Sequence, residues 1–164
     1  MFQSCKSIEE AGFTGFQTIE RLWRDHSILP DKPGVYVILH PENASVSYMT
    51  QGVGGFFKRR NPNIAVEQLQ SRWIDDCAVL YIGQAGGNGS TSTIKKRIKQ
   101  YLDFGKSLPV GHYGGRYIWQ LSHHPQLIVA CKEIKGADAR LEEKLLLTEF
   151  VNYYGRLPFA NINR

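Results

Sequence analysis

Two short apolar stretches decide the fold of this chain of 164 residues: Gly34-Val-Tyr-Val-Ile-Leu39 and Ala78-Val-Leu-Tyr-Ile-Gly83. Both are rich in β-branched and aromatic residues and are short, as buried strands are. Pro33 disfavours a helical conformation at Lys32, so the chain enters the first stretch extended. We expect strands over 35–39 and 78–82 that pair antiparallel.

The rest of the chain predicts mainly helices. Apolar residues recur at helical spacing over 16–25, and a second helix is expected over 66–73. Ser92 or Thr93 can cap a helix whose inner stripe is Ile94, Ile98, Tyr101 and Leu102. The last helix should run from a cap at Asp138 to Gly155. Residues 116–121 and 127–134 are both expected to be extended.

These elements predict a single domain over 1–164 of the mixed α/β (α+β) class. Its core would be a small central antiparallel three-stranded sheet flanked by helices. The domain would carry an N-terminal helical extension over 1–30 and an insertion over 40–77 between the two paired strands.

Composition limits the classes of protein to which the chain can belong. Hydrophobic residues make up 42% and charged residues 21%, as in ordinary globular domains. The sequence contains no run of roughly 18 apolar residues, so no membrane span is predicted. Acidic residues stand near the N-terminus, where a secretory signal needs an apolar stretch. We therefore expect a cytoplasmic protein that does not enter a membrane.

Metal-binding and disulfide patterns are missing from the sequence. Cys5, Cys77 and Cys131 are odd in number and far apart, and the histidines show no His-x-x-x-His spacing. Neither a disulfide framework nor a zinc site is predicted. The net charge of +5 and the pI near 9.2 suit a polyanionic partner.

The two apolar stretches also carry a motif. They contain Gly34-Val35-Tyr36 and Tyr81-Ile82-Gly83, and three polar residues follow in a fixed order: Arg97, Glu149 and Asn161. Glu149 precedes Asn161 by 161 − 149 = 12 residues. This arrangement resembles the GIY-YIG nuclease family over residues 33–161. The main departure is the insertion over 40–77, where the family usually has a short hairpin.

The resemblance implies a metal-dependent DNA endonuclease. Glu149 would be the sole protein carboxylate on Mg²⁺ or Mn²⁺, whereas Glu142 and Glu143, earlier on the same helix, are expected to be solvated. Arg97 would bind the scissile phosphate, a task that suits its planar and permanently charged guanidinium. One phenol, Tyr36 in preference to Tyr81, would act as general base on the attacking water, and the other would orient water.

Two further residues complete the expected catalytic set. Tyr101, four residues after Arg97, would hold the phosphate or the arginine, or would pack into the core. Asn161 would anchor phosphate and the framework of the site. A phenol has an ordinary pKa of about 10, so a general base of this kind needs a neighbouring cation. Part of the family has a lysine after Tyr-Ile-Gly, and Gln84 stands there in this chain.

Basic residues in three places are candidates for DNA contact. They are Lys58, Arg59 and Arg60 of the insertion, Lys95, Lys96 and Lys99 around Arg97, and Arg116 at the end of the aromatic and glycine-rich stretch 112–116. The alternative is that these charges are merely solvated. Two other functions stay open: a nucleic-acid-binding protein that keeps the fold without catalysis, and an RNA-directed nuclease, because RNA shares the phosphate backbone.

Overall fold

The computed structural model describes residues 1–87, 89–135 and 138–163. Within them, four antiparallel strands form one sheet in the order β1-β4-β2-β3. The strands are β1 (Thr14–Thr18), β2 (Gly34–Leu39), β3 (Val79–Ala85) and β4 (Ile128–Glu133). The fold is of the expected mixed class, but the described sheet has four strands where three were predicted.

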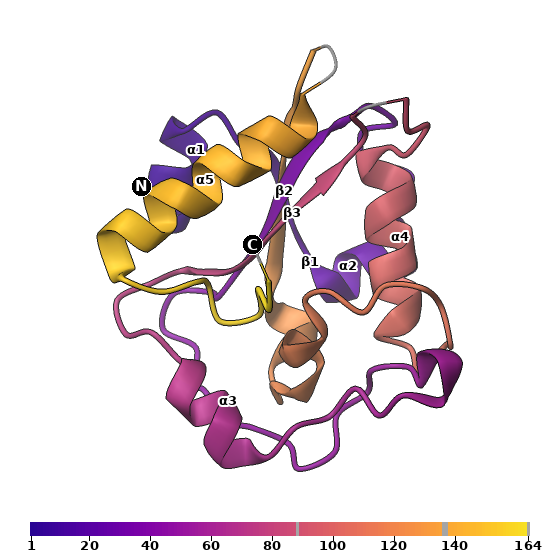
Figure 1. Ribbon diagram of the computed structural model, residues 1–164, viewed down its shortest axis with the longest axis vertical. Helices are drawn as coiled ribbons and strands as arrows, with labels where there is room; N and C mark the ends of the chain where they lie inside the picture. The colour runs from indigo at the N-terminus through magenta and orange to yellow at the C-terminus, as the bar shows by residue number, and fades with distance from the viewer. Residues whose placement is uncertain (88, 136–137, 164) are drawn as a thin grey trace.

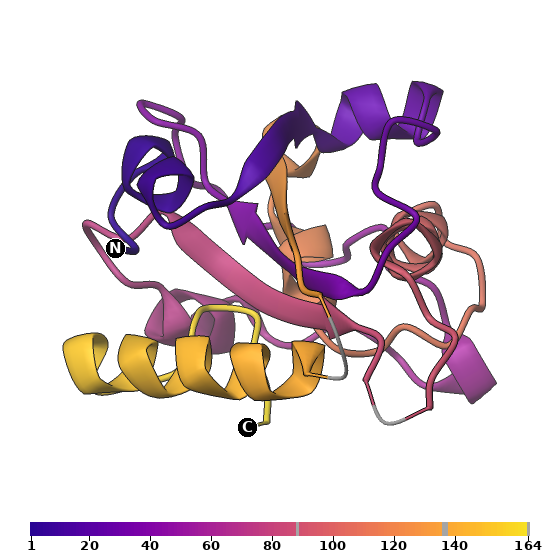
Figure 2. The same cartoon turned by 90° about the horizontal axis from the view of Figure 1, so that it is seen from above.

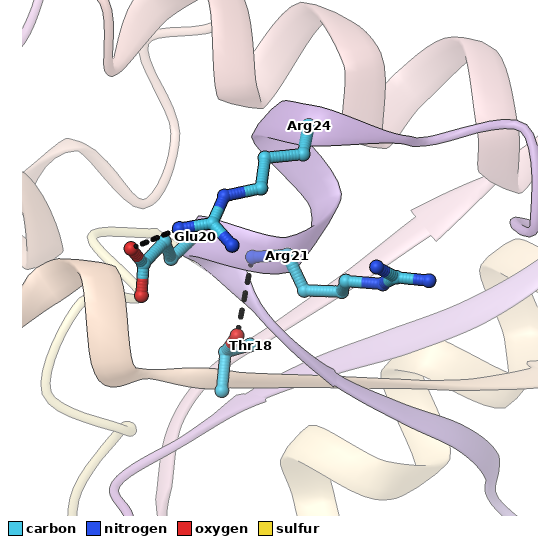
Figure 3. A network of polar contacts seen from close by, with 4 residues as sticks. All are labelled: Thr18, Glu20, Arg21 and Arg24. Carbon is cyan, nitrogen blue, oxygen red and sulfur yellow. Dashed lines mark hydrogen bonds and ion pairs between the residues drawn. The ribbon is translucent and has the colours of Figure 1, made fainter.

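The additional strand is β1, in the segment predicted to be a helical extension. The chain is extended through Thr18, and helix α2 covers only Ile19–Arg24. Thr18 pairs with Ile128 of β4, so tertiary strand pairing overrides the helical spacing of the apolar residues. The Thr18 hydroxyl then caps α2 by accepting from the Arg21 amide at 3.2 Å (Figure 3).

Helices cover both faces of the sheet (Figures 1 and 2). Helix α5 (Ala139–Tyr154) and helix α1 (Cys5–Glu10) pack on the face that carries Val35 and Val37. Helix α4 (Ile94–Phe104) and α2 pack on the face that carries Tyr36 and Ile38. Alternate residues of β2 therefore point into two separate apolar clusters, as the pleat of a strand requires.

The insertion over 40–77 contains a short 3-10 turn, Phe57–Arg59, and helix α3 (Val66–Arg72) at the position predicted. Its Leu69 is buried in the α4 side of the core. Of the two other segments expected to be extended, 127–134 is confirmed as β4. The prediction for 116–121 is wrong, because Arg116–Gln120 forms a 3-10 helix.

The predicted start of α4 and both predicted ends of α5 are confirmed, whereas the helix predicted over 16–25 begins only at Ile19. Thr93 caps α4 by accepting from the Lys96 amide, Asp138 caps α5 by accepting from the Leu141 amide, and Gly155 ends α5 at φ 71°. In the part of the chain that the structure describes, no helix combines the length and the apolar character that crossing a membrane requires.

Candidate active site

Tyr36 and Tyr81 meet on the α4 side of the sheet. Tyr36 lies opposite Gly83 of β3, and the register steps by one residue farther along the pair of strands. Tyr81 pairs with Ile38 in the regular register, on the face of the sheet that carries Tyr36, and the irregularity adds Leu80 to the same apolar cluster. The two tyrosine ring centroids are 6.1 Å apart. The antiparallel register thus brings the two motif tyrosines together.

The two phenols differ in their access to solvent. Tyr36 is 0% exposed, and its hydroxyl has no hydrogen-bond partner among the described residues. Burial, and then the neighbouring Tyr81, raise the pKa of Tyr36 well above its ordinary value, and Arg97 acts against this rise. Tyr81 is 8% exposed, and burial raises its pKa to about 12. Both phenols are therefore protonated near neutral pH, and Tyr81 is the one that borders a cavity.

Glu143 of α5 supplies the carboxylate of this site. With Tyr81, Asn161 and Arg116 it lines a cavity of about 280 Å³ beside β3. Burial raises the pKa of its carboxyl, while the charges of Arg97 and Arg140 act in the opposite direction. The ion pairs found among the described residues do not include Glu143. This partly buried carboxylate is therefore available to a ligand.

The structure does not bring Glu149 to the tyrosines. Residues six apart in an α-helix are separated by about 9 Å along the axis and point about 120° apart around it, so Glu143 and Glu149 do not face the same cavity. Glu149 is exposed, and Glu142 pairs with Lys132 at 2.8 Å. Glu143, and not Glu149, therefore lines the cavity beside Tyr81, and the expectation that Glu143 is solvated is corrected, because this residue is partly buried.

Arg97 lies in the first turns of α4, close to the tyrosines and to Glu143. Its charge lowers the pKa of Tyr36, Tyr81 and Glu143, against the effect of burial on each. It lines a second cavity together with Arg140. The start of α4 is held by backbone hydrogen bonds to the segment before β2. The amides of residues 94 and 95 donate to the carbonyls of residues 32 and 30 at 2.9 and 3.0 Å.

Tyr101 is a core residue with a structural hydrogen bond. Its hydroxyl donates to the carbonyl of Gly115, and its ring centroid is 5.6 Å from that of Tyr81. Of the roles expected for Tyr101, packing is the one that this geometry favours. The ring also lies 4.4 Å from that of His112, which is 0% exposed and has no partner for either ring nitrogen among the described residues. Burial, and then Arg97, lower the pKa of His112 well below its ordinary value.

Asn161 joins the C-terminal segment to β3. Its Oδ1 accepts from the Ile82 amide at 2.9 Å and its Nδ2 donates to the Ile82 carbonyl at 2.8 Å. Arg72 of α3 holds the same segment, because its Nε and Nη2 donate to the carbonyls of Phe159 and Asn161 at 2.7 and 2.6 Å. The Asn161 amide therefore supports the framework of the site, and the insertion supports Asn161.

The basic residues predicted to contact DNA separate into two groups. Arg116 borders the cavity that holds Tyr81 and Glu143. The others lie on exposed or partly exposed surface: Lys95, Lys96 and Lys99 on α4, and Lys58, Arg59 and Arg60 on the insertion. Lys99 pairs with Asp103 at 2.7 Å. The insertion packs near the far end of α4, since a Cβ at Gly54 would lie 2.9 Å from the Phe104 ring. Lys58, Arg59 and Arg60 do not line the cavities that hold Tyr81, Glu143 and Arg97.

Comparison of the chain with protein-family models, with curated proteins and with solved structures found no match. Its function is therefore inferred from the motif residues and from the geometry of the cavity beside β3.

Sequence spacing missed the carboxylate and one guanidinium of this site. A signal for Glu143 was nevertheless present, because Glu143, Leu146, Leu147, Phe150 and Tyr154 lie on one stripe of α5 and the three at its centre are buried. Glu149 lies off this stripe. Arg140 is exposed and reaches the site only through the fold, so no local pattern marked it.

Proposed function

We propose that this protein is a metal-dependent DNA endonuclease that hydrolyses phosphodiester bonds at a GIY-YIG-type site. The observation that carries the proposal is that Tyr81 and Glu143 line one cavity beside β3 and that the charge of Arg97, from a third element, acts on both of them. A phenol can position a water molecule, a carboxylate can hold a metal ion, and a guanidinium can stabilise charge on a phosphate. The net charge of +5 suits a polyanionic substrate.

Glu143 is the residue that would hold Mg²⁺ or Mn²⁺. The described residues contain no cluster of three histidine, cysteine or acidic side chains that could bind a metal. A single carboxylate suits Mg²⁺ because this ion usually keeps several waters and takes further ligands from substrate phosphates. When bound, the ion would stabilise charge on the phosphate and lower the pKa of a bound water.

Arg97 and Tyr81 would act on the reacting phosphate group. The Arg97 guanidinium can donate two parallel hydrogen bonds to non-bridging oxygens and so stabilise the charge that develops on them. The Tyr81 hydroxyl borders the cavity and can orient the attacking water. Tyr36 has no exposed surface, and burial raises its pKa well above its ordinary value, so we assign it to support Tyr81 and no longer favour it as the base.

The direct test is incubation of the purified protein with supercoiled plasmid, branched DNA and RNA in magnesium and in excess EDTA. Nicked or linear DNA in magnesium alone is the expected result. Cleavage of RNA and not of DNA would favour the RNA-directed alternative. Binding without cleavage of any substrate would favour the non-catalytic alternative.

A further inference from the structure

The cavity beside Tyr81 and Glu143 adjoins two others along β3 and the start of α5. We number them from the cavity beside Tyr81, which is the first, to the cavity that Arg97 lines, which is the third. Glu143 borders the first and the second cavity, and Gln84 and Arg140 border the second and the third. The three cavities are therefore neighbours that share lining residues, and together we call them the β3 groove. Arg116 lies in its first cavity, Arg140 in its second and third, and Glu143 between them.

The Arg116 guanidinium is held in a fixed plane. It lies over the Tyr113 ring at 4.0 Å and over the Tyr117 ring at 4.8 Å, and its Nη1 donates to the Tyr113 carbonyl at 3.3 Å. The described residues give it no carboxylate partner. Its Nε is buried and has no acceptor among them. A guanidinium held in a fixed plane can donate two parallel hydrogen bonds to two oxygens of a phosphate group.

The other end of the groove is lined by polar groups around Arg140. They are the hydroxyl-bearing Ser90 and Ser92, the turn at Gly86 and Gly87, and the Gln84 side chain, whose Oε1 is buried without a partner in the described residues. Gly86 and Gly87 have φ of 95° and 96°, a conformation that favours glycine. Arg140 is exposed and is not part of any ion pair found among the described residues.

Arg116 and Arg140 carry the same charge and line cavities on either side of Glu143, and Arg97 lines the cavity on the Arg140 side. We infer that Arg116 and Arg140 bind the phosphates that flank the scissile phosphate, so that one DNA strand runs along the β3 groove past Glu143. The inference rests on the proposed function, because it takes the scissile phosphate to lie at Tyr81 and Glu143. It specifies the substrate as a strand that continues on both sides of the cleaved bond.

The test measures DNA binding in EDTA, so that no cleavage occurs. Fluorescence anisotropy of a labelled duplex, repeated over a range of salt concentrations, gives the slope of log K against log salt. The variants are Arg140→Ala and Arg116→Gln, singly and combined. The matched control is Arg21→Ala, because Arg21 is an exposed arginine on α2, and α2 lines none of the three cavities. Thermal melts confirm that each variant is folded.

Each lost phosphate contact should flatten the slope by about 0.9, and the double variant by about 1.8, while Arg21→Ala leaves it unchanged. Slopes equal to that of wild type in both single variants would overturn the inference. A flatter slope in only one of them would show that the DNA strand is not bound on both sides of Glu143. Because binding is measured without cleavage, failure of this inference can be distinguished from failure of the proposed function. If the variants show these slopes but the wild-type protein cleaves no substrate, the proposed DNA path stands and the proposed nuclease activity does not.

Discussion

The Tyr36 ring lies across the backbone of Gly83. A Cβ at Gly83 would stand 2.7 Å from the Tyr36 hydroxyl and 2.6 Å from its Cζ, closer than real Cβ contacts come. The two motif tripeptides are therefore one packing unit, in which the glycine of the second makes room for the tyrosine of the first.

We expect Gly83→Ala to destabilise the fold by about 1–3 kcal/mol, the usual effect of overpacking a core. The measurement is urea unfolding. Gly111→Ala is the matched control, because its Cβ would lie 3.5 Å from the Phe57 ring, which is ordinary contact. Equal stability of the two variants would contradict this packing relationship.

Removal of the Tyr36 hydroxyl and removal of the Tyr81 hydroxyl should have different effects on the protein. Tyr36→Phe deletes a buried hydroxyl without a partner in the described residues, so the free energy of unfolding should be unchanged or higher by about 1 kcal/mol, and cleavage should persist. Tyr81→Phe should slow cleavage by about 100-fold, a typical effect of losing a positioned polar group. If Tyr36→Phe stays folded and loses cleavage, Tyr36 is the reacting phenol.

Glu143 should make stability depend on pH. Because burial raises its pKa above the ordinary 4.5, the folded state binds this proton more tightly than the unfolded state does. The contribution of this proton to the free energy of unfolding is fully present below pH 4.5 and is lost as pH rises through the folded-state pKa. Glu143→Gln should therefore gain stability relative to wild type as pH rises toward neutral in EDTA. Urea unfolding at several pH values checks this, and a difference that does not vary with pH would contradict it.

The insertion should act on the site through Arg72. Arg72→Ala removes two hydrogen bonds to the carbonyls of Phe159 and Asn161, and charged donors of this kind contribute about 1.5–3 kcal/mol each. We expect a loss of about 2–4 kcal/mol and faster hydrogen exchange of the Ile82 amide, which donates to the Asn161 side chain. Arg24→Ala is the control, because its exposed pair with Glu20 is worth less than about 1 kcal/mol. Unchanged exchange at Ile82 would show that Arg72 does not support Asn161.

Local patterns located the central strands and most helix ends, since these depend on neighbouring residues. The apolar composition of the two motif stretches predicted β2 and β3, and the caps at Thr93 and Asp138 marked the starts of α4 and α5. They did not reveal β1, because its partner, β4, lies more than 100 residues away in the sequence. A strand that depends on so distant a partner carries a weak local signal.

The site shows the same distinction. The tyrosines and Arg97 were found from sequence order, and the structure brings these residues close together. The carboxylate was chosen by its distance from Asn161 along the chain, whereas the face of α5 decides which glutamate reaches the cavity. That face is set by the packing of Leu146, Leu147 and Phe150, and it selects Glu143.

The comparison of Glu143→Gln with Glu149→Gln tests the central claim most directly. Both substitutions remove one carboxylate from the same helix and keep the shape of the side chain. Plasmid cleavage in magnesium should fall by at least about 100-fold in Glu143→Gln, with DNA binding retained, and should stay near wild type in Glu149→Gln. Full activity of Glu143→Gln, or loss of activity in Glu149→Gln alone, would contradict the assignment of Glu143 to the catalytic site.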